Sequence, residues 1–243
     1  MLISSVDNKK IKEVKKLRVN KFMDEKQRFI IEGEHLVLEA SKSGLLLETF
    51  STSKITSYGV SNTLVTESVM RLLSSLPSAP KVIGICRFIP EKETLGNKIL
   101  VLDGVQDPGN LGTIIRSACA FNFDTVVLSA NAVRKYNEKV VRATQGMLFK
   151  VNVITRELTT FVKELENLGY VVYKTDVTCG KNLSEIDNKH RLAVVMGSEG
   201  QGVSNAVKGI IANSIYIPMN ERCESLNVAV ASSIIMYELG VEK

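Results

Sequence analysis

The sequence predicts an α/β protein with two parts, a small N-terminal α/β domain and a larger C-terminal parallel sheet. From Lys98 onward, short runs rich in Val and Ile alternate with helical segments, as is typical of a parallel sheet covered on both faces. Pro90 and Gly96 lie in a charged stretch that indicates a linker. A chain of 243 residues can bury a core in each part. We expect a first domain at 1–88, a linker at 89–97 and a second domain at 98–243.

The first domain is expected to begin with an amphipathic helix. Ile11, Val14 and Leu17 recur at helical spacing, and lysines occupy the other faces of this helix. A short strand at 29–31 then leads into a helix that ends at Gly44. The remaining elements expected here are strands at 45–53 and 81–88 and a helix at 68–76.

The second domain is expected to alternate strands with helices. The strands are expected at 98–105, 124–130, 170–177, 191–197 and 214–219. The helices are expected at 111–121, 138–145, 158–168, 203–208 and 226–239. Ligands bind beyond the carboxyl ends of parallel strands, so a functional site is expected in the loops that follow the strands.

The composition is that of an ordinary globular protein, with 44% hydrophobic and 23% charged residues. No apolar run is long enough for a membrane helix, and residues 1–10 lack the apolar core of a signal peptide, so we expect a cytoplasmic protein. The four cysteines stand far apart without CxxC spacing, and the chain has two histidines. This pattern disfavours a structural zinc site, and we expect no metal and free, buried thiols.

Positive charge is concentrated near the N-terminus. Residues 1–28 contain nine Lys or Arg against four Asp or Glu, an excess that equals the net charge of +5 of the whole chain. Such a segment suggests a polyanion partner, because Lys and Arg contacts to phosphate supply most of the sequence-independent affinity for nucleic acids. A solvated helix face explains the same pattern without a partner, and charge alone does not decide between the two.

The first of three polar loops follows the strand expected at 98–105. Asp103 ends that strand, and Asn110 is expected to cap the next helix, in which Arg116 lies beside the apolar stripe. The glycines of this loop do not match GxGxxG, and no Walker A lysine is present. A standard dinucleotide or nucleoside triphosphate site is therefore disfavoured.

The second polar loop is rich in glycine. Gly197, Gly200 and Gly202 follow a strand that is expected to be buried and precede a helix. Three glycines in six positions allow the backbone to approach a ligand closely, whereas a tight turn alone needs only one. Glu199 offers a carboxylate to a hydroxyl or an amine, so we favour a ligand site over a simple turn.

The third polar loop precedes the last helix. Ser225 is expected to cap this helix, since a serine side chain can accept a bond from the first free backbone N–H groups. Asn227 lies inside an apolar run, where a buried amide must find partners or cost about 1–3 kcal/mol. Capping therefore explains Ser225 but leaves Asn227 without a role.

The three loops together resemble the motifs of one protein family. "NLGTIIRSACAF", "GSEGQGVS" and "IPMNERCESLNVAVASSIIMYE" are similar, in order and spacing, to the motifs of the SpoU (TrmH) family of RNA 2′-O-ribose methyltransferases, within the SPOUT class. This resemblance covers about Lys98 to Lys243. The segment "EKQRFIIEGEHLVLEA" resembles the substrate-binding domain of many members, a small α/β module related to ribosomal RNA-binding proteins.

The resemblance implies a fold, a cofactor and an assembly. The fold would be a parallel α/β domain whose C-terminal segment forms a deep trefoil knot, which the general rarity of knots would otherwise argue against. The cofactor would be S-adenosylmethionine, bound in a bent form. The assembly would be a homodimer that covers the apolar last helix. The residues that would bind the cofactor are Gly197, Ile217, Leu226, Thr175, Gly202 and Met219.

The reaction implied is methyl transfer to a ribose 2′-hydroxyl of RNA. Arg116 matches the catalytic arginine of the family, and its permanently charged guanidinium suits stabilisation of a developing alkoxide better than proton abstraction. The other residues that the motifs place in the catalytic site are Asn110, Glu199, Ser225 and Asn227. The residues expected to contact RNA are Lys12, Lys15, Lys16, Arg28 and Arg142.

Several alternatives stay open at this stage. The separate N-terminal domain favours ribosomal RNA of the large subunit, and transfer RNA is the alternative substrate. A protein that binds RNA without catalysis, or a methyltransferase that acts on a base nitrogen, would share the fold. The sequence identifies neither the nucleotide nor any link to antibiotic resistance. It also gives no role for Arg222 and Cys223.

Overall fold

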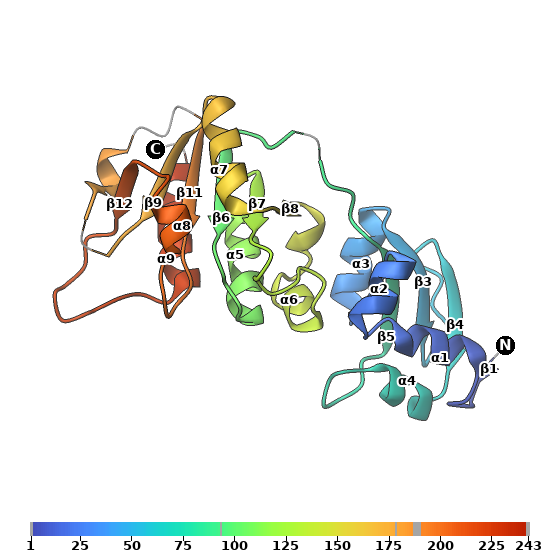
Figure 1. The fold of residues 1–243 in the computed structure, drawn as a ribbon. Helices are drawn as coiled ribbons and strands as arrows, with labels where there is room; N and C mark the ends of the chain where they lie inside the picture. The colour runs from blue at the N-terminus through green and yellow to red at the C-terminus, as the bar shows by residue number, and fades with distance from the viewer. Residues whose placement is uncertain (1, 93, 178, 187–190, 242–243) are drawn as a thin grey trace. The chain divides into compact units, whose positions relative to one another are not determined.

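The computed structural model describes residues 2–92, 94–177, 179–186 and 191–241. The chain divides into two compact units, which we call unit 1 (Met1–Pro90) and unit 2 (Glu91–Lys243). Figure 1 labels the helices and strands of both units along the chain. None of the helices in the described ranges combines the length and the apolar character that crossing a membrane requires.

Unit 1 is built around a mixed sheet. Its strands are β1 (Leu2–Ile3), β2 (Arg28–Glu32), β3 (Leu46–Ser51), β4 (Ser61–Val65) and β5 (Val82–Arg87). Its helices are α1 (Lys9–Lys16), α2 (Asn20–Lys26), α3 (Glu34–Lys42) and α4 (Glu67–Leu73). In the described residues the strand order is β1-β4-β3-β5-β2. β4 pairs in parallel with β1 and β3, whereas β5 pairs antiparallel with β2 and β3.

Helix α1 joins the core of unit 1 through one face only. Ile11 and Val14 are buried in the apolar cluster that also contains Phe50, Val69 and Ile83. The lysines of the other faces stay exposed, as the helical spacing predicts. Helix α2 was not predicted, because it buries only Met23 and so has no apolar period in its sequence.

A buried carboxylate links three elements of unit 1. Glu32, 6% exposed, accepts hydrogen bonds from Ser74 Oγ at 2.6 Å and from Ser75 Oγ at 2.7 Å. The guanidinium of Arg18 lies 3.2 Å from the same carboxylate. Burial alone raises the pKa of Glu32, but the bonds from Ser74, Ser75 and Arg18 outweigh burial and hold the pKa below its ordinary value. The network thereby fastens the chain after α1 and the chain after α4 to the end of β2.

Unit 2 is a parallel α/β domain. Its strands are β6 (Lys98–Leu102), β7 (Thr125–Leu128), β8 (Asn152–Thr155), β9 (Val171–Thr175), β10 (Lys181–Asn182), β11 (Leu192–Met196) and β12 (Asn213–Tyr216). Its helices are α5 (Pro108–Ala120), α6 (Glu138–Ala143), α7 (Leu158–Asn167), α8 (Asn205–Lys208) and α9 (Val228–Gly240), with 3₁₀ turns η1 (Met147–Phe149) and η2 (Leu183–Glu185). In the described residues the strand order is β10-β12-β9-β11-β6-β7-β8, and every pairing is parallel.

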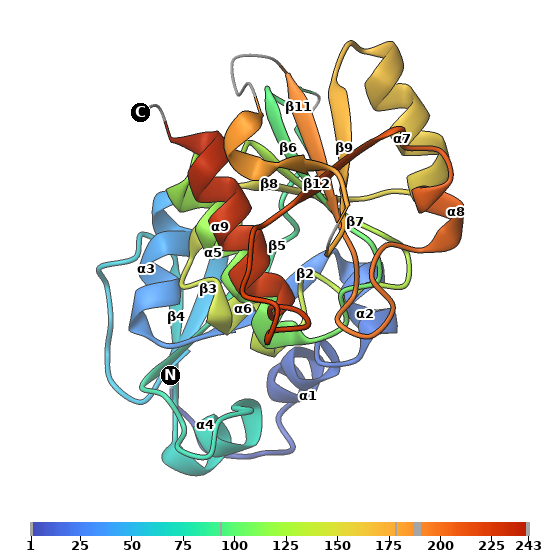
Figure 2. The ribbon, with the colours of Figure 1, turned by 90° about the vertical axis from the view of Figure 1, so that its left-hand side faces the viewer.

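Helices cover both faces of this sheet. Figure 2 shows α5, α6 and α9 on one side and α7 and α8 on the other. Ile99 and Val101 of β6 pack into the cluster formed with α7 and α8, while the alternate residues Leu100 and Leu102 are buried too. Both faces of the central strands are therefore apolar, which explains their continuous Val, Ile and Leu runs. The predicted α/β class with a parallel sheet is confirmed.

Two details of unit 2 differ from the sequence predictions. β8 was not predicted, because its first residue, Asn152, is polar. This side chain is nevertheless buried, and it donates to Thr125 Oγ1 at 3.2 Å and accepts from Lys92 N at 3.1 Å. The short strand β10 was not predicted either, since two residues are too few to show a period.

The expectation of buried thiols is correct for one cysteine and wrong for two. Cys86 is buried in β5, and burial raises the pKa of its thiol. Cys119 is partly buried, whereas Cys179 and Cys223 are exposed. The exposed pair lies in loops, where no apolar face covers them.

Candidate active site

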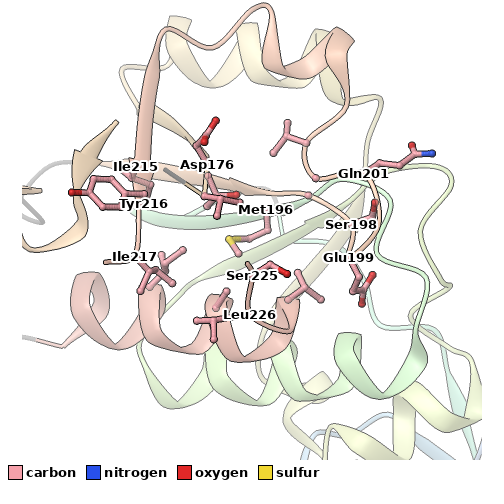
Figure 3. A pocket seen from close by; sticks show the side chains of 18 of the residues that line it. Asp176, Met196, Ser198, Glu199, Gln201, Ile215, Tyr216, Ile217, Ser225 and Leu226 are labelled. Atoms are coloured by element: carbon pink, nitrogen blue, oxygen red, sulfur yellow. The ribbon is translucent and has the colours of Figure 1, made fainter. Parts of the chain in front are cut away.

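The loops at the carboxyl edge of the sheet of unit 2 enclose a cavity of about 390 Å³. Its walls come from the ends of β9, β11 and β12 and from the first turns of α9 (Figure 3). Ligand pockets generally have volumes of about 300–1,000 Å³, so a small molecule fits this space. The cavity lining includes every residue expected to bind the cofactor: Thr175, Gly197, Gly202, Ile217, Met219 and Leu226.

Close backbone packing shapes the glycine-rich loop. Ser198 and Gly202 exchange backbone hydrogen bonds of 3.2 and 3.0 Å and so close the loop on itself. A Cβ atom at Gly197 would overlap the carbonyl carbon of Gly202 and the nitrogen of Val203. Gly202 has a φ of +64°, which favours glycine. Gly200, by contrast, has open space where a Cβ would lie.

Asn110 has a different structural role from the one predicted. The N-cap of α5 is Asp107, whose Oδ1 accepts the backbone N–H of Asn110 at 2.7 Å. Pro108 occupies the first turn of the helix, a position that suits its fixed φ, so the helix begins before Asn110. The side chain of Asn110 is thereby free of capping, and its Nδ2 donates to Glu199 Oε1.

Asn227, not Ser225, caps the last helix. Its Oδ1 accepts the N–H groups of Ala229 at 2.9 Å and Val230 at 3.3 Å. The prediction that Ser225 is the cap was wrong, because the helix begins only at Val228; Ser225 lines the cavity instead. The expectation that the Asn227 amide is buried was also wrong, since the residue is exposed in the chain described here.

The side-chain amide of Asn227 completes a link between the three loops. Its Nδ2 donates to Asn110 Oδ1 at 3.1 Å, and Asn110 in turn donates to Glu199. We call this set, Asn227, Asn110 and Glu199, the polar bridge. Each amide uses its oxygen and its nitrogen at once, so the bridge fixes the relative positions of all three loops. The sequence placed these residues in one site, but it did not pair them.

One residue that holds this arrangement was not predicted as part of the site. Asp103, 8% exposed, begins the loop after β6, and its Oδ2 accepts the backbone N–H of Ser204 at 2.8 Å. The bond fastens the end of the glycine-rich loop to the loop that leads to α5. An acidic residue directly after an apolar strand is the sequence signal that could have indicated it.

Arg116 does not line the cavity. Its side chain is exposed and, within the described residues, forms no hydrogen bond or ion pair. The neighbouring Ser117 contacts Ser233 of α9 through hydroxyl groups 2.8 Å apart. On α9, an exposed apolar row, the α9 row, consists of Val230, Ile234 and Tyr237. Arg116 is therefore on a helix packed directly beside this row and is available to a ligand from solvent.

The residues expected to contact RNA are spread over both units. In unit 1, Lys12 pairs with Asp7 at 2.8 Å and Lys16 with Glu13 at 2.8 Å. Lys15 and Arg28 are exposed on α1 and β2, respectively, and Arg142 is partly buried in the last turn of α6. The ion pairs of α1 are between exposed groups, so they can exchange for phosphate at little cost.

The chemistry of the cavity suits an adenosyl cofactor. Apolar side chains such as Met196, Ile215 and Ile235 offer contacts to a flat base, and the glycine backbone lies close to the space. The polar lining provides hydroxyl and carboxylate groups at the ends. Among the described residues, no group of three or more His, Cys, Asp or Glu side chains is placed to hold a metal ion.

The family model of the SpoU rRNA Methylase family matches residues 97–237, more than half of the chain. This chain belongs to the SpoU rRNA methylase family. A second model, the MRM3-like substrate binding domain, matches residues 8–84 of this SpoU protein. The 23S rRNA (guanosine(2553)-2′-O)-methyltransferase RlmP of Bacillus subtilis (strain 168) is 37% identical to it over 243 residues, and the alignment covers 98% of each chain.

Solved structures agree with this assignment to the SpoU family. A putative RNA methyltransferase of the TrmH family from Porphyromonas gingivalis superposes with a TM-score of 0.87, at 28% identity over 97% of this chain and 98% of that one. An AdoMet-bound rRNA methyltransferase from Sinorhizobium meliloti also gives 0.87, at 26% identity over 98% of this chain and 97% of that one. The SpoU protein described here is an S-adenosylmethionine-dependent enzyme that methylates ribose 2′-hydroxyls in RNA. The resemblance found in the three motifs is confirmed.

Proposed function

We propose that this enzyme methylates the 2′-hydroxyl of one guanosine in the 23S-type RNA of the large ribosomal subunit. The supporting observation is the similarity to RlmP along the full length of both chains, at 37% identity. This similarity includes unit 1, where a substrate-binding family model matches 8–84. The target nucleotide would be the counterpart of guanosine 2553, the position named for that relative.

In this proposal the cofactor occupies the cavity at the carboxyl edge of unit 2. Thr175, Gly197 and Ile217 and the other expected cofactor-binding residues would hold it mainly through backbone groups and apolar contacts. When bound, S-adenosylmethionine supplies an electrophilic methyl group. Glu199 of the polar bridge lines this cavity together with Ser225, so the bridge can order the loops around the reacting ribose.

The 2′-hydroxyl is a poor nucleophile near neutral pH, so its orientation and its developing charge both matter. Positioning alone is worth up to about 7–11 kcal/mol in favourable cases. We assign the stabilisation of the alkoxide to Arg116, whose guanidinium is exposed to an incoming ligand. A donor aimed at a developing oxyanion contributes about a hundredfold to a thousandfold in rate. Lys12, Lys15 and Lys16 of unit 1, with Arg28 and Arg142, would contact RNA phosphates.

The proposal includes a homodimer that is formed through α9. The α9 row exposes 48% of Val230, 38% of Ile234 and 53% of Tyr237 in the single chain. A second copy would cover this row, and Arg116 on the adjacent helix α5 would then lie at the edge of the interface. In Ile234→Glu a buried charge would oppose association, so sedimentation should show a shift from dimer to monomer. A dimer that persists in this variant would rule out this surface.

The trefoil knot is also part of the proposal. After β12, which lies between β10 and β9, the chain crosses the carboxyl edge of the sheet to reach α9, which packs against α5. This crossing and the family relationship support a threaded connection. We place the enzyme in the cytoplasm, because its proposed substrate is ribosomal RNA.

Methylation mapping tests the substrate. Ribose 2′-O-methyl sites should be mapped across total RNA from cells with the gene, without it, and with the Asn110→Ala variant. We expect one site in the large-subunit RNA to disappear without the gene and to return only with the wild-type gene. Loss of a site in transfer RNA instead would replace the proposed substrate, and loss of no site would support a binding protein without turnover.

A further inference from the structure

The cavity contains two carboxylates, and the proposed mechanism uses only one of them. Glu199 belongs to the polar bridge, which links it to Asn110 and Asn227. Asp176 directly follows β9 and lines the same cavity. In Figure 3 the two side chains lie on different sides of Met196, with Asp176 near Ile215 and Glu199 near Ser198. The polar bridge lies at the Glu199 side of the cavity, so Asp176 lies at the side away from the bridge.

Asp176 is held in place from several sides. Its backbone N–H donates to Ile215 O at 2.9 Å, which fixes the residue against β12. Its Oδ1 accepts the N–H of Cys179 at 3.3 Å. Its Oδ2 lies 3.4 Å from the ammonium group of Lys208, and the Asp176 side chain is 20% exposed. This carboxylate is therefore paired with a cation, partly shielded from water and limited in its rotamers.

Lys208 is itself fixed by a second lysine. The ammonium group of Lys174 donates to the carbonyl oxygens of Lys208 at 2.9 Å and Ile211 at 2.6 Å. These carbonyls lie at and just after the end of α8, where backbone acceptors lack helical partners. The backbone of Lys208 is thereby anchored, so its side chain can hold Asp176 from a defined position.

The chemistry of this end of the cavity favours a vicinal diol. A carboxylate offers about four lone-pair sites, enough to accept hydroxyl donors in addition to Lys208 and Cys179. In dinucleotide-binding folds, an acidic residue accepts hydrogen bonds from the ribose of the cofactor by the same chemistry. The neighbouring Ile215 and Ile217 provide apolar contacts for the attached base.

We propose that Asp176, positioned by Lys208, accepts hydrogen bonds from the ribose hydroxyls of the cofactor's adenosine. The inference rests on the proposed function in one respect, the assignment of this cavity to the cofactor. Asp176 is thus a cofactor-binding residue, and Lys208 is a positioning residue that acts through it.

Calorimetric titration of the full chain with two ligands tests the proposal. The first ligand is S-adenosylhomocysteine, and the second is its 2′,3′-dideoxy analogue, which lacks the hydroxyls. Hydrogen bonds to a charged group are worth about tenfold to a hundredfold in affinity. Asp176→Ala should therefore lower the affinity for S-adenosylhomocysteine by that factor and leave the affinity for the dideoxy analogue unchanged. Asp176→Asn, which keeps the shape and one acceptor oxygen, should fall between.

Two further variants complete the design. Glu185→Ala removes an exposed carboxylate of η2 that does not line the cavity, and it should bind both ligands like the wild type. Lys208→Met should lower the affinity for S-adenosylhomocysteine by a smaller factor than Asp176→Ala does. When the two substitutions are combined, Lys208→Met should cause no further loss of affinity. Rescue by Lys208→Arg would support a role through charge and position.

The outcomes separate this inference from the proposed function. If Asp176→Ala lowered the affinity for both ligands equally, or for neither, the proposed role of Asp176 would be wrong. The assignment of the cavity to the cofactor would not be affected by that result. Wild-type affinity for S-adenosylhomocysteine in a Gly197→Ala variant would instead contradict the assignment of the cavity, and with it both proposals.

Discussion

The lysines of α1 in unit 1 lie on the exposed faces of a single helix, whereas the polar groups of unit 2 come from loops separated by up to 117 residues along the chain. On α1, a charged side chain needs only to point away from the core, and its ion pairs are local, such as Lys16 with Glu13. In unit 2, Asn110 and Asn227 meet only because the backbone of each loop is held in place. We therefore expect substitutions of the exposed lysines of α1 to have small effects. Substitutions that disturb the loop backbones of unit 2 should have large effects.

The strongest test of this difference is Gly197→Ala. The new methyl group would overlap backbone atoms of Gly202 and Val203, which cannot move aside as a flexible side chain could. The loop that lines the cavity must then shift, and we expect S-adenosylmethionine binding to fall below detection in calorimetry.

Gly200→Ala is the matched control in the same loop. Beyond the chain neighbours, no protein atom lies within 4 Å of a Cβ at this position, so the loop should keep its backbone and cofactor affinity should fall much less than in Gly197→Ala. Equal loss in both variants would mean that loop flexibility, and not the close approach at Gly197, determines binding.

Arg116→Ala tests whether the catalytic charge acts apart from the cavity. Because Arg116 does not line the cavity, its loss should leave cofactor affinity unchanged. Methyl transfer to RNA should slow by about a hundredfold to a thousandfold, the usual effect of removing one oxyanion donor. Single-turnover transfer of labelled methyl, with cofactor binding measured in parallel, separates the two effects. Near-normal turnover would exclude the proposed role.

Unit 1 has one position where geometry, and not surface charge, is decisive. Glu32→Gln removes the charge from a carboxylate held by Ser74, Ser75 and Arg18 and should destabilise unit 1 by about 1–3 kcal/mol near pH 7. Since the folded pKa of Glu32 lies below its ordinary value, its contribution is present above pH 4.5 and is lost as the pH falls through the folded pKa.

Urea unfolding at pH 7 and at pH 3 checks both parts of this prediction. Circular dichroism would follow the whole chain, and hydrogen exchange in β2 would report on unit 1. The difference between wild type and Glu32→Gln should shrink at the lower pH. Glu25→Gln, at an exposed position of α2, is the control and should leave the free energy of unfolding unchanged at both pH values. A difference that stays constant with pH would assign the effect to packing.

The smallest effect is expected for the lysines of α1. Replacing Lys12, Lys15 and Lys16 with Gln should weaken RNA binding by about 0.2–1 kcal/mol per residue, because exposed charges contribute little each. The slope of affinity against salt should fall by up to about 2–3 units, and cofactor affinity should not change. Lys163→Gln on α7 is the control. An unchanged salt dependence would mean that these lysines form a solvated helix face and do not contact RNA.

The sequence predicted the elements with a clear apolar period and missed those without one. The central strands β6, β7 and β11 are apolar on both faces, so their residue runs identified them, and β9 was identified by its Val-Val-Tyr run. Strands β1, β4, β8 and β10 and helix α2 were missed because they begin with polar residues, are very short, or bury one residue. Both helix caps of the site were assigned to the wrong residue, since several residues near each helix start could serve as caps.

By itself, the sequence determined the α/β class, the family and the loops that border the cavity, because short motifs specify backbone turns and apolar contacts that act locally. Only the tertiary structure decided which polar atoms pair. Asn110 is 89 residues from Glu199 and 117 from Asn227, and a hydrogen bond between them depends on where the chain crosses the edge of the sheet. The same holds for Asp176 and Lys208, whose contact arises because β9 ends next to α8 in the folded sheet.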